Sequence, residues 1–428
     1  MLSVFLVTFY ILIQSVACRN IIHELHQPQQ FHLGLAENPK SMYITWATEA
    51  DSGKGFLKYG ENETSFVTVE VSCEKYIHYD GYNNSQRAGY VYKAVATNLK
   101  LDTTYVYSVG NSYASSKWRS FKTLKSDASS WSPTILLFGD LGLVNPVSMS
   151  YMKKLKGTFS YVLHLGDIAY DMDDDEGIVG DKFMNMIEPL SAYHPYMTIP
   201  GNHDSGHNFT EYKNRFNNPG KDNLFYSLDI GPAHIIFYNS EAYYFLDEYG
   251  YDRMQTQYNW LEQDLIKAVA NRKTIPWIIV HGHRGLYCSS MDTLTCTKDN
   301  LMRVGYKGDY SLEALFHKYG VDLAVNGHEH DYERMYPLYH YNYEKFSSIH
   351  LYENPKYTTY VILGNAGNEE DFSLFQEKKP VWSVVRERIY GYAMMDITSS
   401  SLNFTAYGIN EETNTSLLID YFTITKDT

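Results

Sequence analysis

The chain has 428 residues, of which 44% are hydrophobic, and it carries a formal net charge of −14. This length allows two or three domains of roughly 150 residues, each with enough apolar material for a core. The negative net charge argues against nonspecific nucleic-acid binding, which needs a basic surface. An acidic protein that acts on anionic substrates needs a local positive centre, which a bound metal ion provides.

Residues 1–17 have the pattern of a secretory signal peptide. An apolar run over residues 4–13 leads to the small residues 15–17, although the usual basic start is missing. This run is short for a membrane span, and no later stretch is long enough for one. We therefore expect a secreted protein, extracellular or lysosomal, with no membrane span. Five Asn-x-Ser/Thr sequons agree with this route: Asn62, Asn83, Asn208, Asn403 and Asn414.

The four cysteines suggest one short disulfide loop. Cys288 and Cys296 are close enough in sequence to pair with each other. Cys18 lies at the predicted cleavage region, and Cys73 is either a buried thiol or a partner of Cys18. The sequence contains no Cys/His spacing typical of a zinc site.

Residues 22–125 form the first predicted domain, an all-β sandwich. Alternating apolar and polar residues predict strands at 41–46, 56–60, 90–96, 105–109 and 119–123. The pattern Leu99-x-Leu101-x-Thr103-x-Tyr105 resembles the tyrosine corner of immunoglobulin-like sandwiches. No polar residues converge in this segment, so it is interpreted as a packing or positioning module. A Ser-rich stretch, 126–133, is the predicted linker.

Residues 132–428 form the second predicted domain, of the α/β class. Five apolar, β-branched runs predict buried strands of one sheet, at 135–138, 161–165, 196–199, 277–280 and 323–325. Helices are predicted around 147–156, 182–191, 255–269 and 311–319, the last with Gly320 as its C-cap. Further strands at 358–364, 391–397, 402–407 and 417–425 close the domain. The acidic run 171–176 is interpreted as a solvated loop, because it lacks the ligand pattern of a calcium loop.

Polar side chains follow each of the five predicted strands at the point where the strand ends. The loops beyond the carboxyl ends of such strands form the usual ligand crevice of an α/β sheet. One Gly-Asp pair means little, but five strand ends with oxygen and nitrogen donors predict a metal site. The seven donors are Asp140, Asp167, Tyr170, Asn202, His283, His328 and His330.

Seven donors are enough for two metal ions of different character. A free tyrosine has a pKa of about 10, so a phenolate ligand at neutral pH requires a strongly acidic ion, and iron(III) suits oxygen and imidazole ligands. Imidazoles and an amide carbonyl suit a divalent partner, zinc, manganese or iron(II), and one carboxylate can bridge both ions. Two metals roughly 3.5–4 Å apart clamp the attacking and leaving oxygens of phosphoryl transfer.

Five motifs in this order resemble those of the purple acid phosphatases: GDLG (139–142), GDIAY (166–170), GNHD (201–204), VHGH (280–283) and GHEH (327–330). Four further segments are similar to the animal branch of that family, acid phosphatase type 7 or iron/zinc purple acid phosphatase-like proteins: 179–183, 195–197, 231–236 and 319–322. The resemblance runs from about residue 27 to the end of the chain. It implies a fibronectin-III-like N-terminal sandwich followed by an α/β metallophosphoesterase domain.

The resemblance also implies a role for each donor. The family pattern puts Asp140, Tyr170 and His330 on a ferric ion. It puts Asn202, His283 and His328 on a divalent ion, with Asp167 bridging the two. Charge transfer from Tyr170 to iron would give the purple colour, and His203 would hydrogen-bond the substrate phosphate. The implied activity is acid phosphatase: hydrolysis of phosphate monoesters, on small molecules or phosphoproteins, by attack of a metal-bound hydroxide.

The chain departs from the family pattern in the loop after His283. Many relatives have a histidine about nine residues further on, whereas this chain has Asp292, as the animal branch does. A protonated Asp292 is one candidate general acid, and solvent is the other. The branch usually has His-Arg-Pro, whereas this chain has His283-Arg284-Gly285 with an extra His281 upstream. His283 fits the motif spacing better than His281, and Arg284 either binds phosphate or supports the site.

Two other functions remain open from the sequence. The same metal site could hydrolyse phosphodiesters or nucleotides. Alternatively, the chain could be a non-catalytic secreted binding module built on the sandwich, which predicts the loss of metal ligands. None of the seven donors is missing.

Overall fold

The computed structural model describes residues 22–81, 85–125, 131–220 and 222–427. The predicted signal peptide, Cys18 and Asn83 lie outside these ranges, as does most of the predicted linker. In the part of the chain that the structure describes, no helix is both long enough and apolar enough to cross a membrane.

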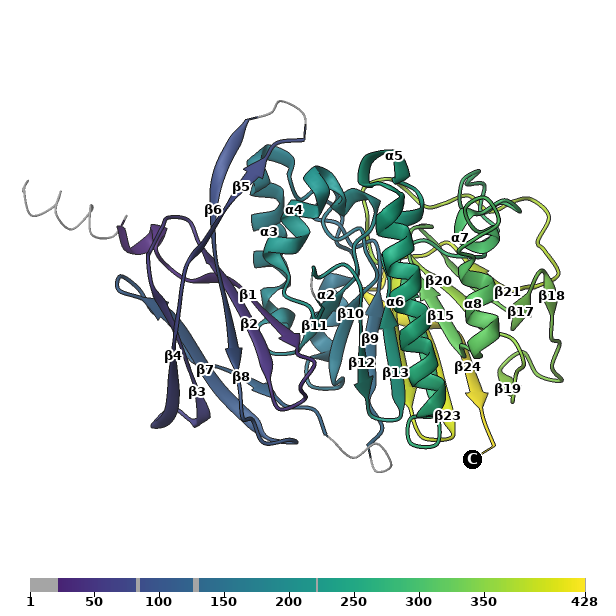
Figure 1. Ribbon diagram of the computed structural model, residues 1–428, viewed down its shortest axis with the longest axis horizontal. Helices are drawn as coiled ribbons and strands as arrows, with labels where there is room; N and C mark the ends of the chain where they lie inside the picture. Colours follow the sequence, from purple (N-terminus) through teal and green to yellow (C-terminus); the bar gives the residue numbers. More distant parts are fainter. Residues whose placement is uncertain (1–21, 82–84, 126–130, 221, 428) are drawn as a thin grey trace, which may run out of the picture.

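The N-terminal region is a sandwich of two four-stranded sheets, at the left of Figure 1. One sheet has the order β1 (Gln29–Leu35), β2 (Met42–Thr48), β6 (Gln86–Ala96), β5 (Glu74–Tyr79). The other has the order β4 (Ser65–Val71), β3 (Gly55–Asn62), β7 (Thr104–Asn111), β8 (Arg119–Lys122). The fully buried Trp46 stacks on Tyr92 between the sheets, with ring centroids 5.0 Å apart.

The predicted tyrosine corner is present. The hydroxyl of Tyr105 accepts a hydrogen bond from the backbone N–H of Lys100, 2.9 Å away. The five strands predicted here correspond to β2, β3, β6, β7 and β8. Strands β1, β4 and β5 were missed; β4 is mostly exposed, so its sequence lacks the apolar alternation of a half-buried strand.

The α/β region contains two seven-stranded sheets. The β9 sheet has the order β11 (Tyr196–Thr198), β10 (Tyr161–His164), β9 (Thr134–Phe138), β22 (Gly391–Ile397), β23 (Ser401–Asn410), β24 (Thr415–Thr425), β19 (Leu351–Glu353). The β14 sheet has the order β12 (Tyr226–Ile230), β13 (Ala233–Phe237), β14 (Trp277–Gly282), β15 (Leu323–Asn326), β20 (Thr359–Leu363), β16 (Tyr332–Met335), β21 (Ser383–Glu387). A two-stranded hairpin follows, β17 (Leu338–Tyr339) and β18 (Asn342–Tyr343).

The prediction of one sheet for the five motif-bearing strands is wrong. Strands β9, β10 and β11 are parallel neighbours in one sheet, while β14 and β15 are parallel neighbours in the other. Parallel strands that are buried on both faces all have continuous apolar sequences, so these sequences do not indicate which strands pair with each other. The predicted architecture, an N-terminal β-sandwich followed by an α/β domain, is confirmed.

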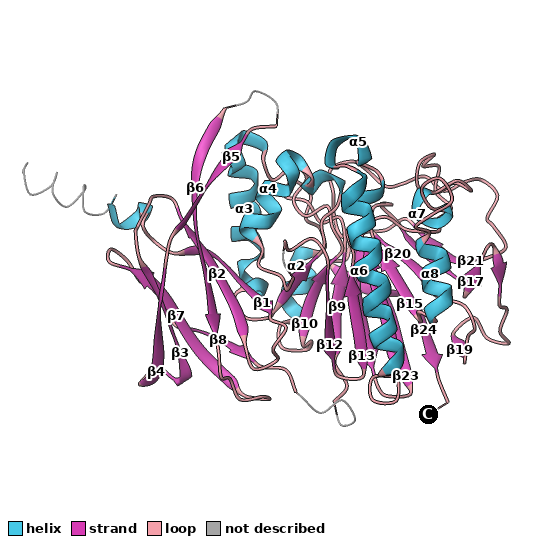
Figure 2. Cartoon of the chain, in the orientation of Figure 1, coloured by secondary structure: helices cyan, strands magenta, loops and turns pink. Residues whose placement is uncertain are grey.

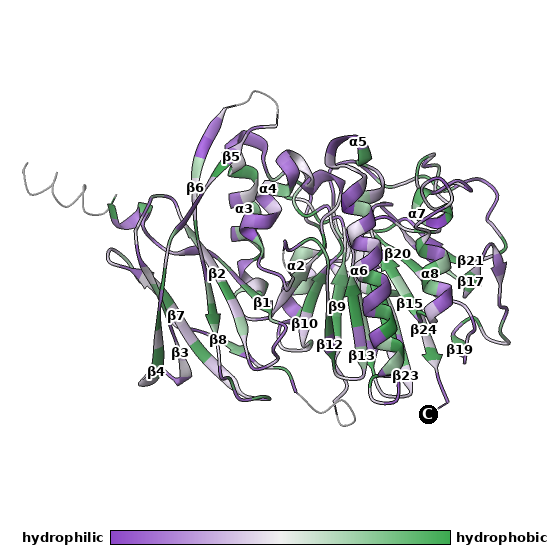
Figure 3. Cartoon of the chain, in the orientation of Figure 1, coloured by the Kyte–Doolittle hydropathy of each residue, from purple (hydrophilic) through white to green (hydrophobic). Residues whose placement is uncertain are grey.

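Helices cover the sheets, as Figure 2 shows for α6 (Tyr251–Ala270) and α8 (Leu312–Tyr319). In Figure 3 the strands of this region carry most of the hydrophobic colour, while α6 carries both kinds of residue, as expected for a helix with one buried face. At α8, the hydroxyl of Ser311 accepts from Ala314 N–H, and Gly320 takes the left-handed conformation (φ 62°) as the predicted C-cap.

Two helix predictions needed correction at their ends. The helix predicted at 147–156 is only the single turn α2 (Met149–Met152), followed by a 3₁₀ turn η1 (Lys153–Leu155). Helix α3 (Asp174–Ser191) is interrupted at residues 175–177 by left-handed backbone angles, and its regular part after Gly177 still begins before the predicted start at 182. The remaining short helices are η2 (Asn202–Asp204), α4 (Gly206–Arg215), η3 (Ser240–Tyr243), α5 (Leu246–Tyr249) and α7 (Leu301–Val304).

A buried charged cluster joins the sandwich to α3 and α4. Arg215 is 4% exposed, and its guanidinium donates to Glu211 and Asp181, each at 2.8 Å, and to the carbonyl of Gly177 at 2.7 Å. From β5, His78 Nδ1 lies 2.9 Å from the same Glu211 carboxylate. We call these residues, His78, Asp181, Glu211 and Arg215, the interface cluster.

Candidate metal centre

The carboxyl ends of the parallel strands of the two sheets meet at one place, and all seven predicted donors lie there. Asp140 follows β9, Asp167 and Tyr170 follow β10, and Asn202 opens η2 after β11. From the other sheet, His283 follows β14, and His328 and His330 follow β15. Both carboxylates are almost fully buried, at 0% exposure for Asp140 and 1% for Asp167.

An oxygen-rich group forms around Asp140. The hydroxyl of Tyr170 lies 2.7 Å from His330 Nε2 and 3.5 Å from Asp140 Oδ1. His330 Nε2 is itself 3.6 Å from Asp140 Oδ1. The other ring nitrogen of His330 faces the carbonyl oxygen of Asp371 at 2.9 Å, which orients Nε2 toward the centre.

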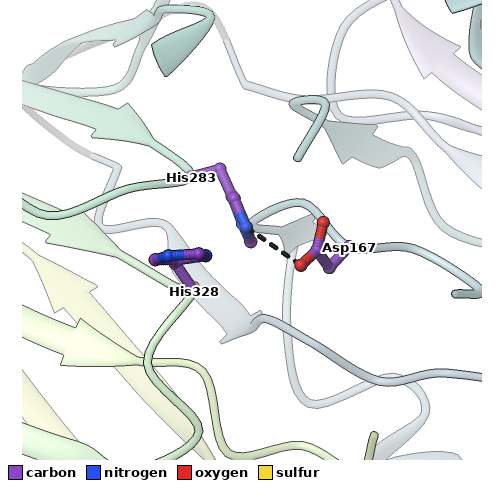
Figure 4. Close-up of side chains that lie close together, drawn as sticks. All are labelled: Asp167, His283 and His328. Atoms are coloured by element: carbon purple, nitrogen blue, oxygen red, sulfur yellow. Dashed lines mark ion pairs between the residues drawn. The ribbon is translucent and has the colours of Figure 1, made fainter. Parts of the chain in front are cut away.

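A nitrogen-rich group forms around Asp167, and Figure 4 shows its three closest members. His283 Nε2 lies 3.1 Å from Asp167 Oδ2 and 3.2 Å from Asn202 Oδ1. Its Nδ1 faces the carbonyl oxygen of Leu165 at 2.8 Å, so Nε2 is the nitrogen turned to the site. Three donor atoms lie within 4.8 Å of one another, one each from Asp167, His283 and His328.

Four of the seven donors stand on strained backbone. Asp140, Asp167, Tyr170 and His328 have φ angles of 59°, 47°, 58° and 72°. This left-handed region is uncommon for residues other than glycine, and a bulky residue such as tyrosine is a clear outlier there. Such strain persists only where the surrounding structure over-determines it, which is typical of functional sites.

The charges of the site fit bound cations. Within the described residues, neither Asp140 nor Asp167 has a Lys or Arg side chain within ion-pair distance. Burial raises the pKa of Asp140 well above its usual range, and the negative charge of Asp167 adds to the rise. Burial, followed by the charges of Asp140 and Asp167, likewise raises the pKa of Tyr170. Oxygen donors without a Lys or Arg partner, joined by imidazoles and no thiolate, match the preferences of iron and of a borderline divalent ion.

His328 is held in the neutral form that binds metals. Its Nε2 lies 2.8 Å from Nη1 of Arg284, whose Nε in turn donates to the buried Glu241 at 2.9 Å. Burial, and next the positive charge of Arg284, lower the pKa of His328 to about 4. Arg284 is thus anchored beside the site with its guanidinium facing a predicted ligand, which supports a role at the centre rather than on the surface.

His203 lies at the edge of the centre between two acidic residues that the sequence did not single out. Its backbone N–H donates to Asp167 Oδ1 at 2.9 Å, and its ring nitrogens lie 3.2 Å from Asp171 and 3.4 Å from Glu370. Burial opposes protonation of the ring, but the hydrogen bonds to Asp171 and Glu370 outweigh it and raise the pKa of His203 to about 12.

The prediction of a solvated loop over residues 171–176 needs correction in part. Asp171 pairs with His203, whereas Asp175 is exposed, and Asp175 and Glu176 have non-helical backbone angles (φ 54° and 55°) at the start of α3. Glu370 lies in a loop after β20 with no motif around it, so only its position in the fold reveals it.

Asp292 lies beside the centre, on the loop closed by the predicted disulfide, which is present between Cys288 and Cys296. Its Oδ2 is 3.3 Å from His328 Nε2, and it lines the same pocket as Asp167 and Asn202. Burial opposes ionisation of Asp292, but the contacts with His328 and with the backbone N–H of Leu294 hold its pKa below the usual range.

His281 is not part of the centre. It is fully buried within β14, with Nδ1 3.3 Å from the carbonyl oxygen of Val325, and burial lowers its pKa to about 3. The neighbouring His283 is the histidine that faces Asp167. Cys73 forms no disulfide within the described residues, and its possible partner Cys18 lies outside them.

Three family models match the chain in order along its length. Residues 28–123 match the purple acid phosphatase N-terminal domain, residues 133–332 the calcineurin-like phosphoesterases, and residues 357–417 the C-terminal part of iron/zinc purple acid phosphatase-like proteins. These ranges include the sandwich and all seven donors.

Similar curated proteins cover most of the chain. Acid phosphatase type 7 of Mus musculus is 41% identical over 379 residues, spanning 87% of this chain and 86% of the mouse protein. The Fe(3+)-Zn(2+) purple acid phosphatase 12 of Arabidopsis thaliana is 26% identical and spans 91% of this chain and 82% of its own. Among solved structures, purple acid phosphatase PPD1 from yellow lupin (Lupinus luteus) seeds superposes with a TM-score of 0.78 at 22% identity, over 94% of this chain and 75% of the lupin chain, which shows the shared fold.

Proposed function

The chain belongs to the purple acid phosphatase family, and from this premise we propose that it hydrolyses phosphate monoesters at a binuclear metal centre on the secretory route. As a member of that family it is a metal-dependent acid phosphatase. The observation that carries the proposal is the division of the donors into two groups. One gathers on Asp140 and the other on Asp167, and among the described residues the basic side chains within ion-pair distance of these carboxylates are the imidazoles of His330 and His283, not Lys or Arg.

The two groups correspond to two ions of different character. We assign Asp140, Tyr170 and His330 to iron(III). We assign Asn202, His283 and His328 to a divalent ion, zinc or else iron(II) or manganese, with Asp167 between the two. The match to iron/zinc purple acid phosphatase-like proteins and the similarity to a Fe(3+)-Zn(2+) enzyme support this pair. When bound, such a pair activates water and withdraws charge from the phosphate group.

The side chains around the donors provide the remaining chemistry. His203, held protonated between Asp171 and Glu370, is placed to donate a hydrogen bond to a phosphate oxygen. Arg284, anchored by Glu241, is a second cation for the same anion. Asp292 is the proposed proton donor to the leaving oxygen. Because contacts in this structure hold its pKa low, that role requires the contact with His328 to be released.

The compartment follows from sequence and covalent structure together. The signal-like N-terminus predicts entry into the secretory pathway. The disulfide between Cys288 and Cys296 is of the kind that persists in oxidising compartments. Sequons at Asn62 and Asn414 are exposed and accessible to glycosylation. We therefore propose a glycoprotein that is secreted or lysosomal, acting on small phosphate esters or phosphoproteins.

The test uses the protein purified from a eukaryotic secretory host. We expect iron with a second divalent metal, a visible absorption band in the purple-to-pink range, and hydrolysis of p-nitrophenyl phosphate at acidic pH. Tyr170→Phe should abolish the band, because the phenolate is the source of charge transfer to iron. A visible spectrum unchanged by that substitution would refute the ligand assignment. Bis-p-nitrophenyl phosphate in the same assay separates monoesterase from diesterase activity.

A pH–rate profile tests the proton donor separately. If Asp292 is the general acid, Asp292→Asn should change the pH dependence of kcat while leaving the visible band in place. A profile identical to that of the wild type removes Asp292 from the mechanism and leaves solvent as the proton source.

A further inference from the structure

Two segments next to the metal centre are joined to each other by backbone hydrogen bonds. One is the disulfide loop, residues 288–296, and the other is the segment 374–382 that leads into β21. The N–H of Met291 donates to the carbonyl of Leu374 at 2.7 Å, and the N–H of Gln376 donates to the carbonyl of Ser289 at 2.9 Å. These bonds and the disulfide fix the two segments relative to each other.

Large apolar side chains on these two segments are turned to solvent. Met291 is 63% exposed and Leu294 65% on the disulfide loop, while Leu374 is 55% and Val381 70% on the facing segment. Single exposed apolar residues are ordinary on protein surfaces. Four on two paired segments are a local concentration of exposed apolar side chains, which is typical of a binding surface, and two of them, Met291 and Val381, line one groove.

A groove of about 780 Å³ runs along this patch. Its walls include the disulfide, the exposed Met291 and Val381, and the aromatic rings of Tyr341 and Trp382. This volume is within the range of small-molecule sites, which are mostly apolar with a few polar groups. The charged residues that line the groove are Asp292 and Lys298, one of each sign, so its walls favour an uncharged ligand.

The groove lies next to the metal centre, with Asp292 in the walls of both. The same residue lines the groove and the pocket that contains Asp167, Asn202 and His328. A phosphate monoester carries a single organic group, and the apolar space that adjoins the phosphate pocket here is this groove.

We propose that the groove between residues 288–296 and 374–382 binds the organic group of the substrate, and that it selects phosphate monoesters of uncharged aromatic alcohols larger than one ring. This inference rests on the proposed function. The aromatic side chains of Tyr341 and Trp382 offer ring faces and edges to such a group, and the exposed Met291 and Val381 cover it on binding.

The kinetic test compares 1-naphthyl phosphate with O-phosphoserine, whose organic group is small and charged. In the double variant Met291→Ser, Val381→Ser, we expect kcat/KM for 1-naphthyl phosphate to fall about tenfold, mainly through KM, because two apolar contacts are lost. The value for O-phosphoserine should change less than about twofold. Both side chains are largely exposed, so the variant keeps its core. Val67→Ser, at a 54% exposed position on β4 of the sandwich, is the matched control and should change neither value.

A binding measurement separates this inference from the proposed function. Fluorescence titration of 1-naphthol needs neither metal nor turnover, and we expect saturable binding to the wild type that the double variant weakens about tenfold. Binding without hydrolysis of either ester would reject the phosphatase function and keep the groove. Hydrolysis of both esters with equal sensitivity to the double variant, or no difference in naphthol binding, would overturn the groove assignment.

Discussion

The interface cluster and the metal centre are both buried and rich in carboxylates, yet they balance charge in opposite ways. In the interface cluster, Arg215 donates to Glu211 and Asp181 at 2.8 Å, so each charge has a fixed partner within the chain. In the metal centre, the groups that hydrogen-bond or ion-pair with the Asp140 carboxylate within the described ranges are the hydroxyl of Tyr170, the backbone N–H of His328 and the ring of His330. The first arrangement pairs its carboxylates with a guanidinium, whereas the second places its carboxylates beside imidazoles and a phenol, which are side chains that bound cations take as ligands.

This difference shows how a structural cluster and a functional one can be told apart by charge. Burying an ion pair costs free energy of desolvation, and the attraction and hydrogen bonds between its two charged groups offset that cost. A group of buried carboxylates on strained backbone, with imidazoles but no Lys or Arg beside them, is typical of a functional site. Substitutions should therefore affect stability at the interface cluster and activity at the metal centre.

The largest effect is expected from Asp140→Asn, which keeps the shape of the side chain and removes its charge. We expect kcat/KM for p-nitrophenyl phosphate to fall at least about 1000-fold together with the iron content, since the proposed ferric ligand set is broken. The free energy of unfolding of the metal-free protein should stay equal or rise, because a fully buried carboxyl group without a Lys or Arg partner is replaced by a neutral amide. Metal analysis and urea unfolding after chelation measure both quantities. A clear loss of stability in the metal-free variant would contradict the expected difference between the metal centre and the interface cluster.

The next largest effect is expected from Arg215→Met at the interface cluster. Removing the guanidinium leaves Glu211 and Asp181 buried without their partner, which costs about 3–5 kcal/mol in the free energy of unfolding. Lys54→Met is the control, because the Lys54–Glu70 pair is 72% and 67% exposed, and such surface pairs contribute about 1 kcal/mol or less. Urea unfolding at neutral pH compares the two variants. Equal effects would mean that burial does not govern the strength of these pairs.

A smaller and pH-dependent effect is expected at His32, which joins β1 of the sandwich to β11. The ring is fully buried with Nε2 2.7 Å from the carbonyl oxygen of Tyr196, and burial lowers its pKa to about 4. Because the unfolded chain binds the proton more readily, stability from this group is present above about pH 6.5 and is lost as the pH falls toward 4. The whole loss amounts to about 3 kcal/mol.

His32→Gln tests this titration. The Gln amide nitrogen can donate to the same carbonyl but does not titrate, so the fall in Tm between pH 6.5 and pH 4 should be shallower than in the wild type. His23→Gln, at an exposed position, should leave the slope unchanged. If the two variants show the same slope, the buried ring of His32 is not a source of acid sensitivity.

The sequence predicted the motif-bearing strands and the residues that meet at their ends, for a local reason. A buried parallel strand is a continuous apolar run, and the polar residue after it is necessarily near the sheet edge. Asp140, Asp167 and His283 were found in this way. The arrangement of these strands in two sheets could not be predicted, because pairing partners such as β9 and β22 are more than 250 residues apart and leave no local pattern.

The surroundings of the donors were also beyond prediction. Glu370 reaches His203 from a loop after β20, and Glu241 anchors Arg284 from η3. Neither contact has a fixed spacing in the chain, so nothing near either glutamate indicates its partner. The groove beside Asp292 likewise depends on the pairing of residues 288–296 with residues 374–382, which only the folded chain brings together.

Three glycines pack directly against the two carboxylates of the centre, and this has a consequence for inherited or engineered variation. A Cβ on Gly201 would collide with Asp167, and a Cβ on Gly327 or Gly364 would collide with Asp140. Even alanine, the mildest change at most positions, would displace a carboxylate at these three. In a saturation map of tolerated variants, these positions should therefore be as intolerant as the donors themselves, although they carry no functional group. An assessment of variants in this chain by chemical similarity alone would rank them as harmless.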